Sequence, residues 1–316
     1  MIGRLRRLRA EVLGLNRRNH AYLFAYNPRD HYRVVDDKRA TKAALAAHGV
    51  PTPGLRHVCD TQGRIRALGD RLAAASDFVL KPARGAGGSG IVVIVERRER
   101  RFVKASGATL GRRDLEAHAC DVIAGTYSPG GQGDALLVEE RVVAEPVLAA
   151  LAYRGVPDVR VLVFRGVPVL AMLRLPTRRS DGRANLHLGG VGVGVDLTTG
   201  RTTFGVRGGR PVSDHPDLGR PLSGMEVPAW HDVLSLAVRA ADAVRLGFLG
   251  VDVVLDRRRG PLVLELNARP GLGIQVANRR GLRPILERLA AQSVPGEVSA
   301  RIALGQALAY DCGSSR

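Results

Sequence analysis

Two adjoining apolar stretches near the end of the sequence constrain the fold more than any other feature. Residues 247–271 read GFLGVDVVLDRRRGPLVLELNARPG, in which the apolar runs 251–255 and 261–266 flank a basic turn that ends in glycine. Short apolar runs on either side of such a turn predict a β-hairpin. Because alternate side chains of a strand share a face, Glu265 and Asn267 are expected to point the same way.

Asp252 lies on the partner strand of this hairpin and reaches the same side if the register allows. Two carboxylates and an amide oxygen make an oxygen-only set, which suits Mg²⁺ that holds substrate phosphates. The alternative is an edge hairpin with solvated acids. We favour the metal site, because Glu265 and Asn267 interrupt a run typical of a buried strand, where ionised groups need a partner or a metal.

Length and composition indicate a globular protein. The 316 residues, 45% of them hydrophobic, can bury a large core and form two domains or one domain of two lobes. No apolar run has the length of a membrane span, and the basic start lacks the apolar core of a secretion signal. The three cysteines are far apart, which predicts neither a disulfide framework nor a zinc site. We therefore expect a cytoplasmic protein without a transmembrane segment.

The formal net charge of +18 is a weaker signal than it first suggests. A strongly basic chain can bind nucleic acid, an anionic membrane or an acidic substrate. Here, however, only four of the 48 basic residues are lysines, and the others are arginines spread along the whole chain. Such a bias is consistent with codon usage. Aromatic residues make up only 4% of the chain, which argues against a stacking surface for single-stranded nucleic acid. Nucleic acid is thus not the expected partner.

The first third of the chain predicts two helices and a glycine-rich hairpin. Residues 5–15 are typical of a basic amphipathic helix, which either touches a membrane or a partner or, as we favour, docks on the main body. A second helix over 38–48 can be capped by Asp36 or Asp37, and it places Lys38 and Lys42 on one face.

Residues 78–95 read FVLKPARGAGGSGIVVIV. The glycines satisfy the dinucleotide pattern G-x-G-x-x-G, but a β-branched strand follows where that motif requires a helix. The segment predicts a strand–loop–strand flap whose tip, Gly87, Gly88 and Ser89, folds over a triphosphate with its backbone amides. Lys81, at the end of the first strand, is expected to contact phosphate oxygens. The alternative is a mobile surface hairpin without a ligand.

The middle of the chain adds further polar candidates. The strand 135–142 ends in acids that can present backbone groups to adenine and a carboxylate to ribose. Residues 156–177 predict two antiparallel strands joined at Arg165-Gly166. Their polar interruptions are Asp158, Arg160 and Arg174, and the alternative for Asp158 and Arg160 is a cross-strand surface pair.

A second glycine-rich segment, 181–200, contains Arg183 and Asn185, whose donors suit a phosphoryl group or a tetrahedral oxyanion. We interpret 201–225 as a surface loop. Helices are expected around 114–124 and over 230–246 and 282–292.

Taken in order, these segments resemble the ATP-grasp superfamily and, within it, the RimK-like α-L-glutamate ligases. The resemblance runs from about Val34 to Ala290 and rests on seven markers, which are DDKRATKAALAAHGVPTP, FVLKPARGAGGSGI, LVEERV, PDVRVLV, GRANLHLGG, GVDVVL and LVLELNARPG. It implies an α+β fold of two lobes that enclose ATP, here with a reduced N-terminal lobe.

The expected organisation is a basic arm over 1–35, an N-terminal lobe with the flap over 36–134, a C-terminal lobe with the metal site over 135–292, and a tail over 293–316. The resemblance also implies an ATP-dependent ligase that joins a carboxylate to an amine through an acyl phosphate, with glutamate or another amino acid as substrate.

Carried over by motif, the resemblance implies three sets of site residues. The nucleotide-binding set is Lys38, Lys81, Gly87, Gly88, Ser89, Glu140, Arg141 and Asp158, with Glu145 as a rival for the ribose contact. The catalytic set is Arg183, Asn185 and Arg174. Asp252, Glu265 and Asn267 match ligands of two Mg²⁺ ions, for which Mn²⁺ can substitute.

The expected partners are amino-acid or peptide substrates, and the family is often dimeric or tetrameric, which leaves a homo-oligomer open. The alternative function is a catalytically silent ATP-binding sensor or scaffold on an acidic partner.

Overall fold

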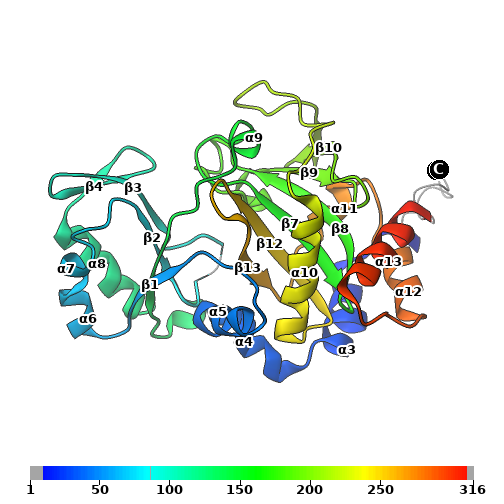
Figure 1. The fold of residues 1–316 in the computed structure, drawn as a ribbon, viewed down its shortest axis with the longest axis horizontal. Coiled ribbons are helices and arrows are strands. Elements are labelled where there is room, and N and C mark those ends of the chain that lie inside the picture. Colours follow the sequence, from blue (N-terminus) through cyan, green and yellow to red (C-terminus); the bar gives the residue numbers. More distant parts are fainter. Residues whose placement is uncertain (1–9, 86, 312–316) are drawn as a thin grey trace. The chain divides into compact units, whose positions relative to one another are not determined.

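The computed structural model describes residues 10–85 and 87–311, which divide into two compact units. The large unit comprises Met1–Asp36, Ala40–Thr52 and Val143–Arg316, and the small unit comprises Asp37–Arg39 and Pro53–Val142. Each unit is built on its own antiparallel sheet with helices packed against it, so the expected α+β class is confirmed (Figure 1). No helix of the described residues is long and apolar enough to cross a membrane.

The large unit is organised around a seven-stranded sheet in the order β11-β10-β9-β8-β7-β12-β13. Its strands are β7 (Asp158–Phe164), β8 (Val167–Leu175), β9 (Val191–Val195), β10 (Thr202–Arg207), β11 (Arg210–Val212), β12 (Phe248–Asp256) and β13 (Gly260–Asn267). Its helices are α2 (Leu15–Arg17), α3 (Phe24–Tyr26), α4 (Tyr32–Asp36), α5 (Lys38–Ala47, of which 38–39 belong to the small unit), α9 (Pro146–Ala149), α10 (Trp230–Val244), α11 (Gly273–Ala277), α12 (Arg283–Ala290) and α13 (Val298–Asp311), with a π-helix η1 (Arg18–Leu23) and 3₁₀ turns η2 (Arg29–His31) and η4 (Leu186–Leu188).

The two-residue alternation of the strands explains the two faces of this sheet. On β7, Val159, Val161 and Val163 pack with α10, whereas Leu162 and Phe164 pack with the N-terminal segment, α11 and α12. We call the second surface the N-terminal face, because residues 13–26 cover part of it. These strands are apolar at nearly every position because both faces are covered.

The N-terminal segment is fixed to this face by buried side-chain amides. Gln275 accepts from the backbone N–H of Leu13 (2.9 Å) and donates to its carbonyl (3.1 Å), while Asn27 makes a matching pair with Phe248. Tyr22 and Tyr26 pack edge-on against Phe164. Of the helix expected over 5–15, residues 1–9 lie outside the described part, and 12–14 are not helical. The described residues 13–27 thus pack on the large sheet, whereas the docking expected for residues 5–9 falls outside the described part.

The small unit has a six-stranded sheet in the order β1-β6-β2-β3-β4-β5. Its strands are β1 (Leu55–Cys59), β2 (Phe78–Pro82), β3 (Val92–Arg98), β4 (Arg101–Lys104), β5 (Thr109–Leu110) and β6 (Leu136–Glu139), and its helices are α6 (Gln62–Arg66), α7 (Leu68–Arg71) and α8 (Arg112–Ile123), with a 3₁₀ turn η3 (Pro129–Gly131). Helix residues such as Leu68 and Leu115 pack against Phe78 and Leu80 of the sheet. The antiparallel pairing of β2 with β3 confirms the hairpin that we predicted around the glycine loop.

The units differ from the lobes that we expected. The strand that begins at residue 136 stays in the small unit because β6 pairs with both β1 and β2, which moves the boundary from 134 to 142. Residues 40–52 belong to the large unit. The expected tail contains α13, whose Gly305 lies so close to the Pro168 carbonyl that a Cβ there would stand only 2.1 Å from the oxygen. Glycine thus lets this helix pack directly on β8.

The surface loop expected over 201–225 was wrong in part. Residues 202–212 form the hairpin of β10 and β11, which extends the large sheet. Its turn is Gly208-Gly209, both with positive φ (56° and 78°), which two-residue hairpins favour because that geometry matches the twist of the strands.

Candidate functional site

A buried network of charged side chains occupies the N-terminal face where β8, β7, β12 and β13 lie side by side. Asp158 pairs in register with Arg174, and Asp252 pairs with Arg160 on one side and with Glu265 on the other. Asp158 and Arg160 lie an even number of residues from Phe164 on β7, and Asp252 lies an even number from Phe248 on β12, so these side chains share the face of the two phenylalanines. Arg174 and Glu265 lie directly opposite Asp158 and Asp252 and therefore share it as well. The hairpin register that we left open is thus the one that brings Asp252 opposite Glu265.

The Asp252 carboxylate is the centre of this network. Its Oδ1 accepts from Arg160 Nε (2.6 Å), and its Oδ2 accepts from Arg160 Nη2 (2.6 Å) and Arg174 Nη2 (2.7 Å). Asn267 Nδ2 also donates to Oδ2, at 3.1 Å. Asp252 is 1% exposed, so two guanidinium groups balance a charge that water does not solvate.

Asp158 lies at the other end of the Arg174 guanidinium, whose Nε donates to Asp158 Oδ1 at 2.5 Å. Both side chains are buried. The surface pair of Asp158 with Arg160 that we considered is therefore wrong, since two residues of one strand share a face and each finds its partner on a neighbouring strand. Arg174 thus donates to both Asp158 and Asp252 and fixes the two carboxylates relative to each other.

The aspartates of this network differ in pKa. Burial raises the pKa of Asp158 to about 6, against the lowering effect of the Arg174 charge. Burial also acts to raise the pKa of Asp252, but the charges and hydrogen bonds of Arg160 and Arg174 together hold that pKa below its usual value. Asp252 is therefore the more firmly ionised of the two carboxylates.

The donor chemistry of this face fits a hard divalent cation. Asp252, Glu265 and Asn267 offer only oxygen ligands, and Glu265 and Asn267 are half-buried on β13. In the described residues, no three His, Cys, Asp or Glu side chains are grouped as a metal site. The Asp252 carboxylate accepts from three side chains, with three hydrogen bonds on Oδ2 and one on Oδ1.

Arg183 and Asn185 lie in the loop between β8 and β9, where Arg183 is exposed and Asn185 precedes η4. Buried Thr177 and Ser180 fix the start of this loop through their hydroxyl groups. The structure shows no side-chain hydrogen bond from Arg183 or Asn185 to any other residue that it describes. Glu145, the rival for the ribose contact, caps α9 by accepting from the Val147 N–H at 2.7 Å.

The small unit places two of the predicted phosphate-binding lysines near the glycine loop. Lys38 Nζ donates to the Gly85 carbonyl at 2.6 Å. Lys81 Nζ lies 2.7 Å from Glu139 Oε2, and both side chains are more than nine-tenths buried. Glu139 was not among the predicted site residues. The sequence feature that could have indicated it is its place beside Glu140, as a second acid at the end of a buried strand.

Glu140 and Arg141, two other predicted residues of the small unit, also have partners. Glu140 donates its backbone N–H to the Gly54 carbonyl and packs its side chain on Gly54. Arg141 Nε lies 3.0 Å from Asp77. At the tip of the loop, Gly87 and Gly88 have positive φ (66° and 81°), a conformation that glycine adopts without strain.

The family of the chain follows from comparison with known proteins. The model of the sugar-transfer associated ATP-grasp family matches residues 17–291. The chain belongs to this family. The expected ATP-grasp membership is thereby confirmed, and proteins of this superfamily in general use ATP and Mg²⁺.

Curated relatives of this ATP-grasp chain include glutamate ligases. It is 29% identical over 249 residues to a probable alpha-L-glutamate ligase of Xanthomonas oryzae pv. oryzae, covering 78% of this chain and 61% of the relative. It is 28% identical over 253 residues to the ribosomal protein bS6–L-glutamate ligase of Salmonella paratyphi B, covering 77% and 61%. The chain thus spans about three-fifths of the length of these relatives. Among solved structures, the D-cycloserine synthetase DcsG aligns with a TM-score of 0.46 and 18% identity over 91% of this chain and 73% of that one.

Proposed function

We propose that this ATP-grasp protein is an ADP-forming ligase that joins a carboxylate to an amine. The observation that supports it most is the oxygen-only set of Asp252, Glu265 and Asn267 on one face of the sheet, in which Arg160 and Arg174 bind the Asp252 carboxylate. Two Mg²⁺ ions bound there would neutralise charge on the transferred phosphoryl group, and Mn²⁺ would support the same chemistry.

The proposed reaction has two steps. First, the γ-phosphoryl group passes from ATP to an oxygen of the substrate carboxylate, which forms an acyl phosphate and releases ADP. An amine then attacks the acyl carbon, the bond from that carbon to the phosphate oxygen breaks, and phosphate leaves as the amine loses a proton. Transfer of this kind depends on positioning and charge neutralisation, so no nucleophilic side chain is required.

The residues of the chain divide these tasks. In the proposal, Lys38, Lys81 and the loop tip Gly87, Gly88 and Ser89 bind the phosphates of ATP, and Glu140 and Arg141 contact the adenine. Arg183 and Asn185 bind the transferred group. Arg174 and Asp158 position Asp252, and the salt bridge of Lys81 with Glu139 keeps that ammonium group oriented. Exclusion of water protects the acyl phosphate from hydrolysis.

The substrates follow from the relatives as a proposal. Two curated relatives are named glutamate ligases, so glutamate or another amino acid is the first candidate, with a peptide as the acceptor. Because the family description refers to sugar transfer, we add carbohydrates that carry an amine or a carboxylate to the candidates. The dependence on ATP places the proposed activity in the cytoplasm.

We expect the purified protein to release ADP only when ATP, Mg²⁺ and the correct substrate pool are present together. The pools are amino acids, glutamate-rich peptides, and amino sugars with uronic acids, each tested alone and in pairs. Release that depends on one pair supports the ligase and identifies its substrate class. Tight ATP binding without ADP release in any pool would support the alternative, a silent sensor on an acidic partner.

A further inference from the structure

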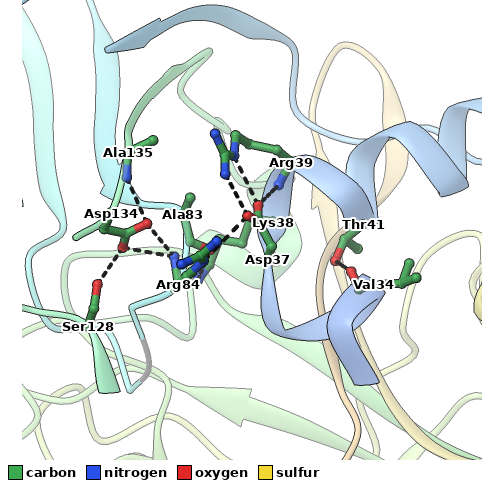
Figure 2. Close-up of polar contacts among 10 residues, drawn as sticks. All are labelled: Val34, Asp37, Lys38, Arg39, Thr41, Ala83, Arg84, Ser128, Asp134 and Ala135. Carbon is green, nitrogen blue, oxygen red and sulfur yellow. Dashed lines mark hydrogen bonds and ion pairs between the residues drawn. The ribbon is translucent and has the colours of Figure 1, made fainter. Parts of the chain in front are cut away.

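Residues 83–90, in the loop between β2 and β3, are bound at their start to the rest of the small unit, in part through one carboxylate. We call this loop the glycine flap. Asp134, two residues before β6, accepts from the backbone N–H of Arg84 with both oxygens, at 3.0 and 3.2 Å (Figure 2). The carboxylate is itself held by the Ser128 hydroxyl (2.7 Å) and the Ala135 N–H (2.7 Å). Asp134 is thus fixed from one side and binds the flap on the other.

The residues on either side of Arg84 are bound as well. Ala83 donates its N–H to the Ala135 carbonyl at 2.9 Å, and its own carbonyl accepts from the Lys38 N–H at 3.0 Å. The Lys38 ammonium donates to the carbonyl of Gly85 at 2.6 Å. Each of the first three residues of the flap therefore has a backbone group in a specific hydrogen bond.

The Arg84 side chain adds a weaker contact. Its guanidinium lies 3.6 Å from Asp37, which also binds Arg39 at 2.8 Å (Figure 2). Burial acts to raise the pKa of Asp37, but hydrogen bonds from Arg39 and the charges of Arg39 and Arg84 together hold it below its usual value. Asp37 is therefore ionised near neutral pH, and Arg84 faces two carboxylates, one at its backbone and one at its side chain.

The end of the flap is fixed by different groups. A ring nitrogen of His118 on α8 lies 3.0 Å from the Gly90 carbonyl. Gly90 has a positive φ of 72°, and a Cβ there would meet the Tyr127 ring at 2.6 Å and Pro82 at 2.8 Å. Between these two fixed ends lie Gly87, Gly88 and Ser89, for which the described part of the chain provides no hydrogen-bond partner.

We propose that Asp134 is a positioning residue that fixes the root of the glycine flap, so that only the flap tip moves when phosphates bind. This role rests on the proposed function, in which the tip covers the phosphates of ATP. A flap whose root is already ordered loses less conformational freedom when it closes on a ligand. Without the carboxylate, the Arg84 N–H and the Ser128 hydroxyl lose their acceptor, and the root is expected to open.

Native-state trypsin digestion tests this at the Arg84–Gly85 bond, which lies within the root. Local opening exposes a bond to protease in proportion to the population of the open form. We expect Asp134→Ala to speed cleavage at Arg84–Gly85 about tenfold or more, as the loss of hydrogen bonds to a charged group predicts. Asp60→Ala, which removes an exposed ion pair with Arg64 in the same unit, should not change it.

A second bond distinguishes local opening from loss of the fold. The Arg98–Glu99 bond lies in the tight turn between β3 and β4, and mass spectrometry follows both bonds in one digest. Faster cleavage at Arg84–Gly85 alone supports the proposal. Unchanged cleavage there, or an equal rise at both bonds, overturns it, and neither result depends on whether the protein turns over ATP.

In the ADP-release assay, Asp134→Ala should raise the KM for ATP while changing kcat less, and Asp134→Asn, which keeps one carbonyl oxygen as an acceptor, should restore part of the affinity. An equal loss of kcat with unchanged KM contradicts a positioning role. Absence of ADP release from the unmodified protein contradicts the proposed ligase and leaves the digestion result to decide the role of Asp134.

Discussion

Replacing Glu265 with alanine is expected to lower ADP release by about a hundredfold or more. Glu265 pairs with Asp252 across β12 and β13 and is one of only two carboxylates in the proposed metal site. Bound metal contributes several kcal/mol to the stabilisation of a phosphoryl-transfer transition state, and about 1.4 kcal/mol corresponds to a tenfold change in rate. The measurement is steady-state ADP release with the substrate pair that supports turnover.

Glu226→Ala is the matched control, because Glu226 is an exposed glutamate of the same unit outside the site. The thermal unfolding of both variants should remain within a few degrees of the unmodified protein, since a half-buried glutamate at this edge of the sheet does not fill the core. Normal turnover by Glu265→Ala would show that Glu265 does not hold the metal.

The second large effect is expected on stability. Arg160→Ala removes the guanidinium that binds both oxygens of Asp252, which is 1% exposed. A buried charge that loses its partner typically costs a protein about 3–5 kcal/mol. We therefore expect the free energy of unfolding of the large unit to fall by about that amount, as measured by urea denaturation followed by Trp230 fluorescence.

Arg17→Ala provides the comparison for Arg160. Arg17 forms an ion pair with Glu287 at 3.0 Å, but both side chains are nearly half exposed. Surface pairs of this kind contribute about 0–1 kcal/mol, so the two arginine variants should differ clearly. Equal effects from the two substitutions would mean that Arg174 alone suffices to hold Asp252.

The central hairpin could be predicted from sequence because its signals are local. The alternation of β12 and β13 and their basic turn give the strands, and the shared face of Glu265 and Asn267 follows from strand periodicity. The partners of Asp252 could not be predicted, since they depend on the pairing of β7 with both β8 and β12. Asp158 and Arg160 lie on one face of β7, and the surface pair that we gave as the alternative for them is wrong because both side chains are buried.

Sequence analysis missed two elements that contain glycine and one contact between residues far apart in the chain. Helix α13 contains Gly305, which lowers helix propensity but is needed for close packing on β8. The hairpin of β10 and β11 was hidden among glycines and prolines, although Gly208-Gly209 is a typical hairpin turn. Asp134 ends a polar, glycine-rich linker, and nothing local indicates that its carboxylate binds Arg84, 50 residues away.

The measurement that tests the proposed ligase most directly is the fate of the carboxylate oxygen. Substrate pools are labelled with oxygen-18 in their carboxyl groups, incubated with ATP and Mg²⁺ in ordinary water, and the released phosphate is examined by mass spectrometry. An acyl phosphate transfers one labelled oxygen to each phosphate, so the account predicts labelled phosphate in an amount equal to ADP. ADP accompanied only by unlabelled phosphate would mean that water, and not a carboxylate, accepts the phosphoryl group, and would contradict the account.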